Sequence, residues 1–196
     1  RRTAVSATTA GLVGAALNAR RGVAADAPTP APTTRRPLPF PPTLGPEVES
    51  AKKNALIMIP YGMFVLGVSD GGRLHAGTIN WVMQSAYREP EFTMGVRRPG
   101  GYGLPFDPAL YDDALHAALV KVRKFSLSFL GNDQAGVARA FMRPASVEGG
   151  RLNGAAFYTR SSGAPILASA PAWFEATVGN SMESADHTLA ASPDSP

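Results

Sequence analysis

Residues 57–81 read IMIPYGMFVLGVSDGGRLHAGTINW, and this stretch decides the fold that the sequence predicts. Apolar and β-branched residues fill Ile57–Val68, and a second such run covers Leu74–Trp81, so the pattern predicts two strands. Between them, the Asp-Gly-Gly sequence at 70–72 tolerates the positive φ angles of a tight turn. We therefore expect an antiparallel hairpin, with Pro60 marking an edge or a bulge in its first strand.

Two motifs near this hairpin suggest chemistry that their surroundings do not support. Residues 67–71, GVSDG, match the nucleophile elbow, but that motif needs a helix directly after the serine, and here Gly72 and a strand follow. Residues 100–103, GGYG, are rich in glycine, but Pro105 interrupts the helix that a dinucleotide-binding fingerprint requires. A serine hydrolase and a Rossmann domain are therefore disfavoured.

Downstream of the hairpin, the pattern predicts strands with helices among them. Asp107 and Pro108 form a strong helix start, and apolar residues then recur at three- and four-residue spacing. The expected elements are a strand over Phe92–Val96, a helix from Asp107 to about Arg123, a half-buried strand over Lys124–Leu130, a short helix capped by Asp133 and running through Phe141, a loop over Val147–Ser169 and a strand over Trp173–Val178.

These elements predict a mainly β fold, a small barrel with helices at its ends. Asp186–Leu189 could start a further strand, but the final residues ASPDSP should stop it. The strands needed to close the barrel therefore look short or absent.

Composition limits the function further. The chain has 196 residues, 44% of them hydrophobic, which suffices for one domain with a core, and no cysteine, which excludes disulfides and thiolate zinc sites. It contains no run of about 18 apolar residues, so we expect no membrane span. Residues 1–46 carry a net charge of +5 and the remainder −1, so the high pI belongs to the leader and a nucleic-acid partner is disfavoured.

That leader resembles a targeting segment. Arg1 and Arg2 precede a mildly apolar stretch, and Ala25-Asp26-Ala27 fits a small-x-small cleavage pattern. We expect residues 1–46 to be a targeting or linker segment, residues 47–190 the folded domain and residues 191–196 a tail. A chloroplast location, including the thylakoid lumen, and a bacterial periplasm reached by a twin-arginine signal both fit, and so does a disordered Ala/Pro/Arg tail.

No metal site is predicted. Asp112 and His116 stand four residues apart on the expected helix, but no second pair at fitting spacing accompanies them. The other histidines, His75 and His187, share no such spacing with them. A solvated helix face explains the pair better.

A polar cluster at the end of the hairpin suggests a ligand site. Amide and hydroxyl side chains recur there beside an aromatic ring, and two arginines follow one strand later. A flavin needs this mixture of hydrogen-bonding groups, apolar contact and cations for the phosphate. Alternatively, the amides satisfy the loop backbone and the arginines face water. The cluster comprises Thr78, Asn80, Trp81, Gln84 and Ser85, followed by Arg97 and Arg98.

From about Ala55 to Leu189, the chain resembles the flavin reductase-like family, whose domain is the FMN-binding split barrel. The likeness rests on the succession IPYGMFVLGVSDGGRLHAGTINWVMQSAYREPEFTMGVRR, KFSLSFLGNDQ, FMRP, EGGRLNG, GAPIL, APAWFEATV and ADHT. The family continues with further barrel strands after Asp-His-Thr, so the resemblance also implies that this chain lacks its C-terminal strands. An open edge or a completing partner would follow.

The resemblance implies roles for the cluster. The flavin ring would lie along the end of the second hairpin strand, with hydrogen bonds from the amide and hydroxyl residues that follow, and its phosphate would meet the arginine loop. His187 would lie near the nicotinamide, although a structural hydrogen bond would explain it equally well. The implied FMN-binding residues are Thr78, Ile79, Asn80, Trp81, Gln84, Ser85, Arg97, Arg98 and Tyr102.

The activity implied is that of an NAD(P)H:flavin oxidoreductase, in which hydride passes from nicotinamide C4 to flavin N5 and the protein aligns the two rings. The resemblance also implies a homodimer with FMN near the subunit interface. The alternative is a flavin-binding or interaction protein without turnover.

Overall fold

The computed structural model describes residues 45–88, 90–99, 113–184 and 186–192. The chain divides into two compact units, whose described parts are residues 45–60 and the described residues from Tyr61 onward. In the first unit, Pro46–Ile57 form helix α1, with proline at its start and Glu47 and Glu49 in its first turn. The predicted targeting segment lies almost wholly outside the described residues and stays a prediction.

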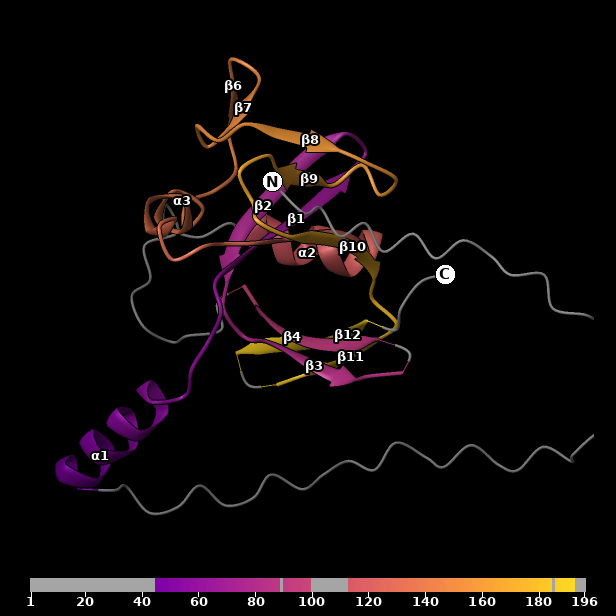
Figure 1. Ribbon diagram of the computed structural model, residues 1–196. Helices are drawn as coiled ribbons and strands as arrows, with labels where there is room; N and C mark the ends of the chain where they lie inside the picture. Colours follow the sequence, from indigo (N-terminus) through magenta and orange to yellow (C-terminus); the bar gives the residue numbers. More distant parts are fainter. Residues whose placement is uncertain (1–44, 89, 100–112, 185, 193–196) are drawn as a thin grey trace, which may run out of the picture. The chain divides into compact units, whose positions relative to one another are not determined.

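The second unit is mainly β, as predicted, and its principal strands form two four-stranded antiparallel sheets (Figure 1). Sheet A has the order β10-β5-β1-β2, and sheet B has the order β11-β12-β4-β3. Among the described residues no strand pairing joins the two sheets, so they do not close into a continuous barrel. The strands are β1 (Phe64–Asp70), β2 (Arg73–Ile79), β3 (Val82–Ala86), β4 (Glu91–Arg97), β5 (Lys124–Phe129), β10 (Trp173–Thr177), β11 (Asn180–Glu183) and β12 (His187–Ser192).

The predicted hairpin is confirmed in its turn and corrected at its start. β1 pairs with β2 from Phe64↔Ile79 to Asp70↔Arg73, and both turn glycines have positive φ, 58° at Gly71 and 89° at Gly72. The first strand does not begin at Ile57, because α1 runs to that residue and β1 starts only at Phe64. The predicted bulge at Pro60 is therefore wrong.

Sheet B holds the largest departures from the expected strands. β3 and β11 were not predicted, and β12 continues to Ser192 along the whole of β4, from His187↔Arg97 to Ser192↔Phe92. The strand expected to start at Asp186–Leu189 is confirmed, and β12 extends to Ser192, the second residue of the ASPDSP segment that was expected to stop it. Its alternating burial, with Thr188, Ala190 and Ser192 facing the core, explains why the strand forms despite its small residues.

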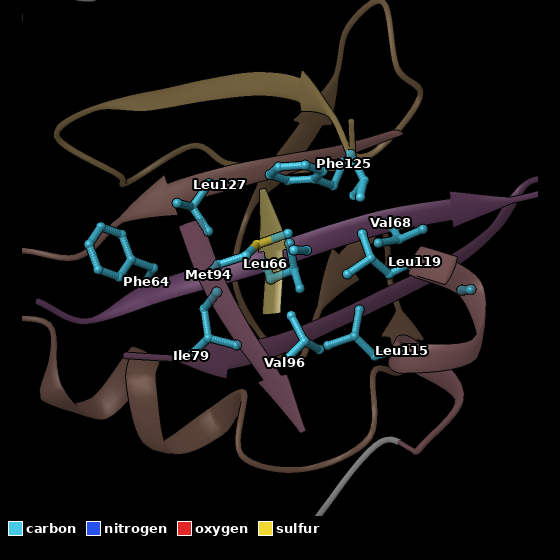
Figure 2. Close-up of a cluster of buried hydrophobic side chains, with 13 residues drawn as sticks. Phe64, Leu66, Val68, Ile79, Met94, Val96, Leu115, Leu119, Phe125 and Leu127 are labelled. Atoms are coloured by element: carbon cyan, nitrogen blue, oxygen red, sulfur yellow. The ribbon is translucent and has the colours of Figure 1, made fainter. Parts of the chain in front are cut away.

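One hydrophobic core lies between the two sheets and helix α2 (Asp113–Val122), as Figure 2 shows. Sheet A contributes Leu66 and Leu127, sheet B contributes Met94, and α2 contributes Leu115 and Leu119. The predicted start of this helix at Asp107 lies outside the described residues. Its end at about Arg123 is confirmed.

A second core covers the opposite face of sheet A, so this sheet is buried on both faces. It lies under helix α3 (Ala135–Ala140) and under two short hairpins, β6–β7 (Val147–Glu148 and Arg151–Leu152) and β8–β9 (Phe157–Thr159 and Pro165–Leu167). The predicted loop over 147–169 is thus partly strand. The cap of α3 is Gln134 rather than Asp133, and it makes no side-chain capping bond.

Because of these hairpins, the strand predicted over Lys124–Leu130 is buried on both faces rather than half-buried. Both of its serines are fully buried, with Ser126 Oγ donating to the Pro165 carbonyl at 2.6 Å and Ser128 Oγ accepting from the Leu167 amide at 3.1 Å. The polar face is therefore covered by β9, not by water. No helix in the described part of the chain is long and apolar enough to cross a membrane.

Candidate functional site

A pocket of about 200 Å³ opens at the end of β2, where the hairpin meets α2 and the residues after α3. The hairpin strand forms one wall and the end of β4 contributes another. The pocket is lined by Met63, Gly77, Thr78, Ile79, Asn80, Val96, Arg97, Leu115, His116, Phe141 and Met142. Four residues of the predicted site, Thr78, Ile79, Asn80 and Arg97, therefore lie together in one hollow.

Gly77 allows the helix to approach the strand closely at this pocket. A Cβ placed on Gly77 would lie 2.7 Å from Leu115 Cδ2, far inside normal contact distance. A larger residue would push α2 away from the strand. Glycine at position 77 thus determines how closely α2 packs against β2 at the pocket.

The next three residues differ in how firmly they are held. Thr78 is fixed twice, because its Oγ1 donates to the Ala138 carbonyl at 2.7 Å and its amide donates to the Phe141 carbonyl at 2.9 Å. Ile79 packs into the core. Asn80 is exposed, and its side chain makes no hydrogen bond to the described part of the chain. Asn80 is therefore an amide that can hydrogen-bond a ligand.

Trp81 lies flat over sheet B rather than inside the pocket. A Cβ on Gly95 would lie 2.9 Å from Trp81 Cε3, so the indole needs a glycine beneath it. The Trp81 carbonyl also accepts from the Gly95 amide at 2.8 Å. With 40% of its surface exposed, the indole presents a flat aromatic face next to Asn80.

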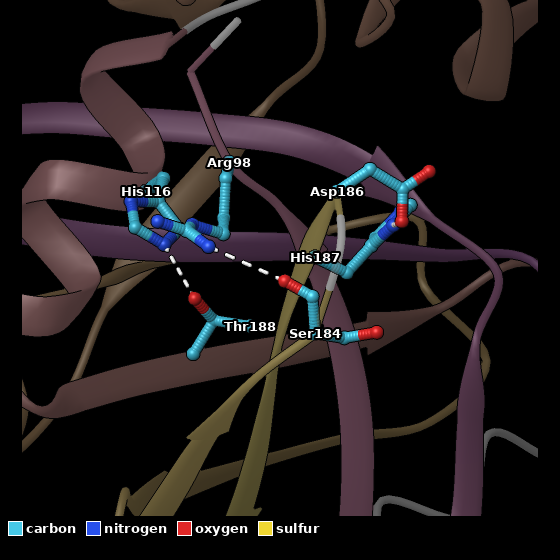
Figure 3. Close-up of polar contacts among 6 residues, drawn as sticks. All are labelled: Arg98, His116, Ser184, Asp186, His187 and Thr188. Atoms are coloured by element: carbon cyan, nitrogen blue, oxygen red, sulfur yellow. Dashed lines mark hydrogen bonds and ion pairs between the residues drawn. The ribbon is translucent and has the colours of Figure 1, made fainter. Parts of the chain in front are cut away.

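His187 packs on this indole. The two ring centroids are 4.2 Å apart with an angle of 33° between the planes. Asp186 Oδ1 lies 2.8 Å from His187 Nδ1, an arrangement in which Nδ1–H donates to the carboxylate (Figure 3). The carboxylate thereby fixes the tautomer and orientation of a ring that is 7% exposed.

The two neighbouring arginines have different surroundings. Arg97 lines the pocket and lies opposite His187 in the β4–β12 pairing. Arg98 points to the turn between β11 and β12, where its guanidinium donates to the Ser184 carbonyl at 3.2 Å and lies 3.3 Å from a Glu183 carboxylate oxygen. The structure thus brings only Arg97 to the pocket.

The remaining predicted site residues lie away from the pocket. Gln84 and Ser85 are on β3, an edge strand of sheet B, and Gln84 Nε2 donates to the Ala86 carbonyl at 2.9 Å. For Gln84, the alternative hypothesis is therefore the correct one: its side-chain amide hydrogen-bonds the local backbone. Tyr102 lies outside the described residues.

Sequence reasoning missed several residues of the pocket. Met63 precedes β1, Phe141 and Met142 follow α3, and His116 comes from α2. His116 Nε2 lies 2.8 Å from Thr188 Oγ1 of β12, so this histidine does not belong to a solvated helix face. His116 directly follows the core residue Leu115 in α2. The apolar periodicity of the helix did not indicate that His116 faces the pocket, because it does not show which strand the helix packs against.

Outside the site, Glu175 of β10 accepts hydrogen bonds from two serines. Burial raises its pKa, but hydrogen bonds from Ser162 and Ser161 outweigh this effect and hold the pKa below its usual value. The contacts are Ser161 Oγ to Oε2 at 2.7 Å, the Ser162 amide to Oε1 at 2.9 Å and a short contact from Ser162 Oγ to Oε1. This carboxylate anchors the β8–β9 turn to sheet A.

Solved structures share this architecture. The styrene monooxygenase flavin reductase from Pseudomonas putida S12 is 23% identical, with a TM-score of 0.58 over 74% of this chain and 84% of its own. The NADH:FAD oxidoreductase SgcE6 from Streptomyces globisporus C-1027 is 21% identical, with a TM-score of 0.59 over 78% of this chain and 83% of its own. At such identities the likeness establishes the fold.

Sequence comparison identifies the family. A relative described as "Putative diflavin flavoprotein A 3", from Synechocystis sp., is 29% identical over 145 residues, which make up 72% of this chain but 22% of that protein. The chain thus spans about a fifth of the length of this relative. Residues 56–192, well over half of the chain, match the family described as "Flavin reductase like domain". The chain therefore belongs to the flavin reductase-like domain family.

Proposed function

We propose that this protein is an NAD(P)H:flavin oxidoreductase that uses FMN. The observation that carries the proposal is the joining of two features at the end of β2: the pocket lined by Thr78, Asn80 and Arg97, and the adjacent Trp81–His187 stack. Family membership supports an oxidoreductase acting with flavin. The choice of FMN and the nicotinamide partner are parts of the proposal.

The chemistry of the pocket fits a flavin. Asn80 offers an available amide, Ile79 and Phe141 offer apolar contact, and Arg97 offers a cation with the fork geometry that phosphate favours. Ligand pockets commonly measure roughly 300–1,000 Å³, so a hollow of about 200 Å³ would hold part of the flavin and leave the rest to the adjoining surface. The indole of Trp81 supplies a flat surface there.

When bound, flavin would supply the hydride acceptor, with NAD(P)H as the donor. The residues of this chain align and shield the reacting rings. Trp81 and His187 pack on each other as a tilted pair of rings, and Asp186 prevents the imidazole from rotating because it holds Nδ1. Rigid ring walls favour the short, parallel approach that hydride transfer needs.

The test is an absorption spectrum of the purified chain mixed with FMN, followed by NADPH or NADH under anaerobic conditions. Oxidised flavin absorbs at about 450 nm. If flavin binds and this absorption is lost when the nicotinamide is added, the proposal is supported. Bound flavin without bleaching indicates the alternative, a flavin-binding protein without turnover. Absence of binding for FMN and FAD alike refutes both.

We also propose that the protein is a homodimer that associates through the outer face of sheet B. Directly paired residues of an antiparallel sheet share a face, so Met182, paired with Leu189, and Met83, paired with Thr93, lie on the face opposite Met94. Met83 is 66% exposed and Met182 is 62% exposed. Together with Trp81 they form an apolar surface of the kind found at subunit interfaces.

Light scattering coupled to size exclusion tests the dimer. Met182→Lys should convert a dimer to a monomer, because it places a charge within this apolar face, whereas Val147→Lys on the distant β6 strand should not. A wild-type chain that is monomeric at all concentrations would refute this part of the proposal while leaving flavin binding open.

A further inference from the structure

Arg98 has a set of contacts that the proposed function does not use. The residue follows β4, and its contacts with the described part of the chain go to the end of β11 and to Ser184 and Asp186, which precede β12. Its amide donates to the Asp186 carbonyl at 2.9 Å, its Nη1 donates to the Ser184 carbonyl at 3.2 Å, and its Nη2 lies 3.3 Å from Glu183 Oε2. Arg98 thus contacts Glu183, the last residue of β11, together with Ser184 and Asp186, and Figure 3 shows its bond to Ser184.

This turn carries the Asp186–His187 pair. The Ser184 amide donates to the His187 carbonyl at 2.8 Å, which closes the turn around the start of β12. His187 then stacks on Trp81, and Asp186 holds its Nδ1. Any change in the positions of Ser184 and Asp186 would therefore move the imidazole relative to the indole.

We propose that Arg98 is a positioning residue, which holds the β11–β12 turn so that Asp186 can fix the His187 ring against Trp81. Its guanidinium holds the Ser184 carbonyl, while its main-chain amide, which any residue but proline would supply, holds the Asp186 carbonyl. The pairing with Glu183 adds little, since that carboxylate is 72% exposed. Arg98 thereby differs in role from its neighbour Arg97, which lines the pocket.

The contact with the indole gives a readout that needs neither flavin nor turnover. Trp173→Phe leaves Trp81 as the sole tryptophan, and His187→Ala in this background gives the emission of an indole without its imidazole neighbour. Arg98→Ala should shift the ligand-free Trp81 emission toward that of His187→Ala. Arg98→Lys should lie between wild type and Arg98→Ala, because lysine keeps the charge but cannot bind both partners. Arg73→Ala, an exposed arginine on β2, is the matched control.

The kinetic readout rests on the proposed function. Arg98→Ala should raise the KM for NAD(P)H about three- to tenfold, the loss expected for one hydrogen bond from a charged group. The Kd values for FMN and riboflavin should both stay within about twofold of wild type. This pattern separates positioning from a direct role in binding phosphate, which would weaken FMN alone.

Two results would overturn the inference. The first is that the Trp81 emission of Arg98→Ala is identical to that of wild type while the emission of His187→Ala differs. The second is that Arg98→Ala lowers the affinity for FMN but not the affinity for riboflavin. If Arg98→Ala does not give a folded protein by circular dichroism, the emission of Arg98→Lys decides. If the chain proves not to reduce flavin, the proposed function fails, but the ligand-free emission still tests the role of Arg98 in placing His187.

Discussion

Sheets A and B have the same number of strands and the same antiparallel pairing, but they differ in how they are covered. Sheet A is buried on both faces, with one core toward sheet B and α2 and another toward α3 and the short hairpins. Sheet B buries one face and exposes Met83, Met182 and part of Trp81 on the other. Sheet A therefore supplies the stability of the fold, and sheet B supplies surfaces that can bind ligands or a partner.

Truncation in sheet A should have the largest effect. Leu127→Ala removes a fully buried side chain from β5 and should lower the free energy of unfolding by about 3–4 kcal/mol. At concentrations where the chain is monomeric, Met83→Ala, on the exposed face of sheet B, should change it by less than about 0.5 kcal/mol. Urea denaturation measures both. Equal losses would show that the outer face of sheet B is buried in the protein in solution.

A methyl group under the indole should test how sheet B holds its ring stack. Gly95→Ala would place a Cβ 2.9 Å from Trp81 Cε3, so the indole must move, and we expect a loss of about 1–2 kcal/mol in stability. Flavin binding and Trp81 emission should both change. Gly136→Ala in α3 meets no atom within 4 Å and should stabilise the protein slightly, by about 0.5–1 kcal/mol. An unchanged emission in Gly95→Ala would contradict the proposed placement of Trp81.

Removal of the pocket cation should act on binding rather than on folding. Arg97→Ala should weaken FMN about tenfold, or about 1.4 kcal/mol, while riboflavin, which has no phosphate, should lose much less. Isothermal titration with the two flavins measures this difference. Arg73→Ala should leave both affinities unchanged. Equal weakening of FMN and riboflavin by Arg97→Ala would remove Arg97 from the phosphate role.

The smallest effect should come from Glu175, on sheet A. Its folded pKa is lowered, mainly because hydrogen bonds from Ser162 and Ser161 overcome the effect of burial. The carboxylate therefore stabilises the fold above its unfolded pKa, and this contribution is lost as the pH falls through the folded pKa. Glu175→Gln should lower the melting temperature slightly at pH 7 and make no difference at strongly acidic pH. A difference that grows on acidification would contradict this assignment.

The hairpin and sheet B show where sequence reasoning succeeded and where it failed. The Gly71–Gly72 turn and the strand after it depend on residues that are adjacent in the chain, and they were predictable. β3 and β11 are short edge strands of mostly exposed residues, and nothing in their composition distinguishes them from loops. They form because β4 and β12 offer backbone groups to pair with, a condition that only the folded chain provides.

The candidate site shows the same division. Thr78, Ile79, Asn80 and Arg97 were predicted and lie together, although their role in binding stays a prediction. Gln84 follows them closely in sequence, but its strand turns away, and its amide binds local backbone. His116, thirty-six residues after Asn80, reaches the pocket through α2. Proximity in sequence is therefore a poor guide to membership of this site.

By itself, the sequence determined the hairpin, the mainly β class, the end of α2 and the family, because turn chemistry, apolar periodicity and the order of motifs are local properties of the chain. Only the tertiary structure decided that both faces of sheet A are buried and that Arg97 and Arg98 have different surroundings. Neighbouring side chains on a strand point to opposite faces, and the element that covers each face is set by packing between distant segments. The same packing separates Arg97, the last residue of β4, which lines the pocket, from Arg98, which contacts the β11–β12 turn.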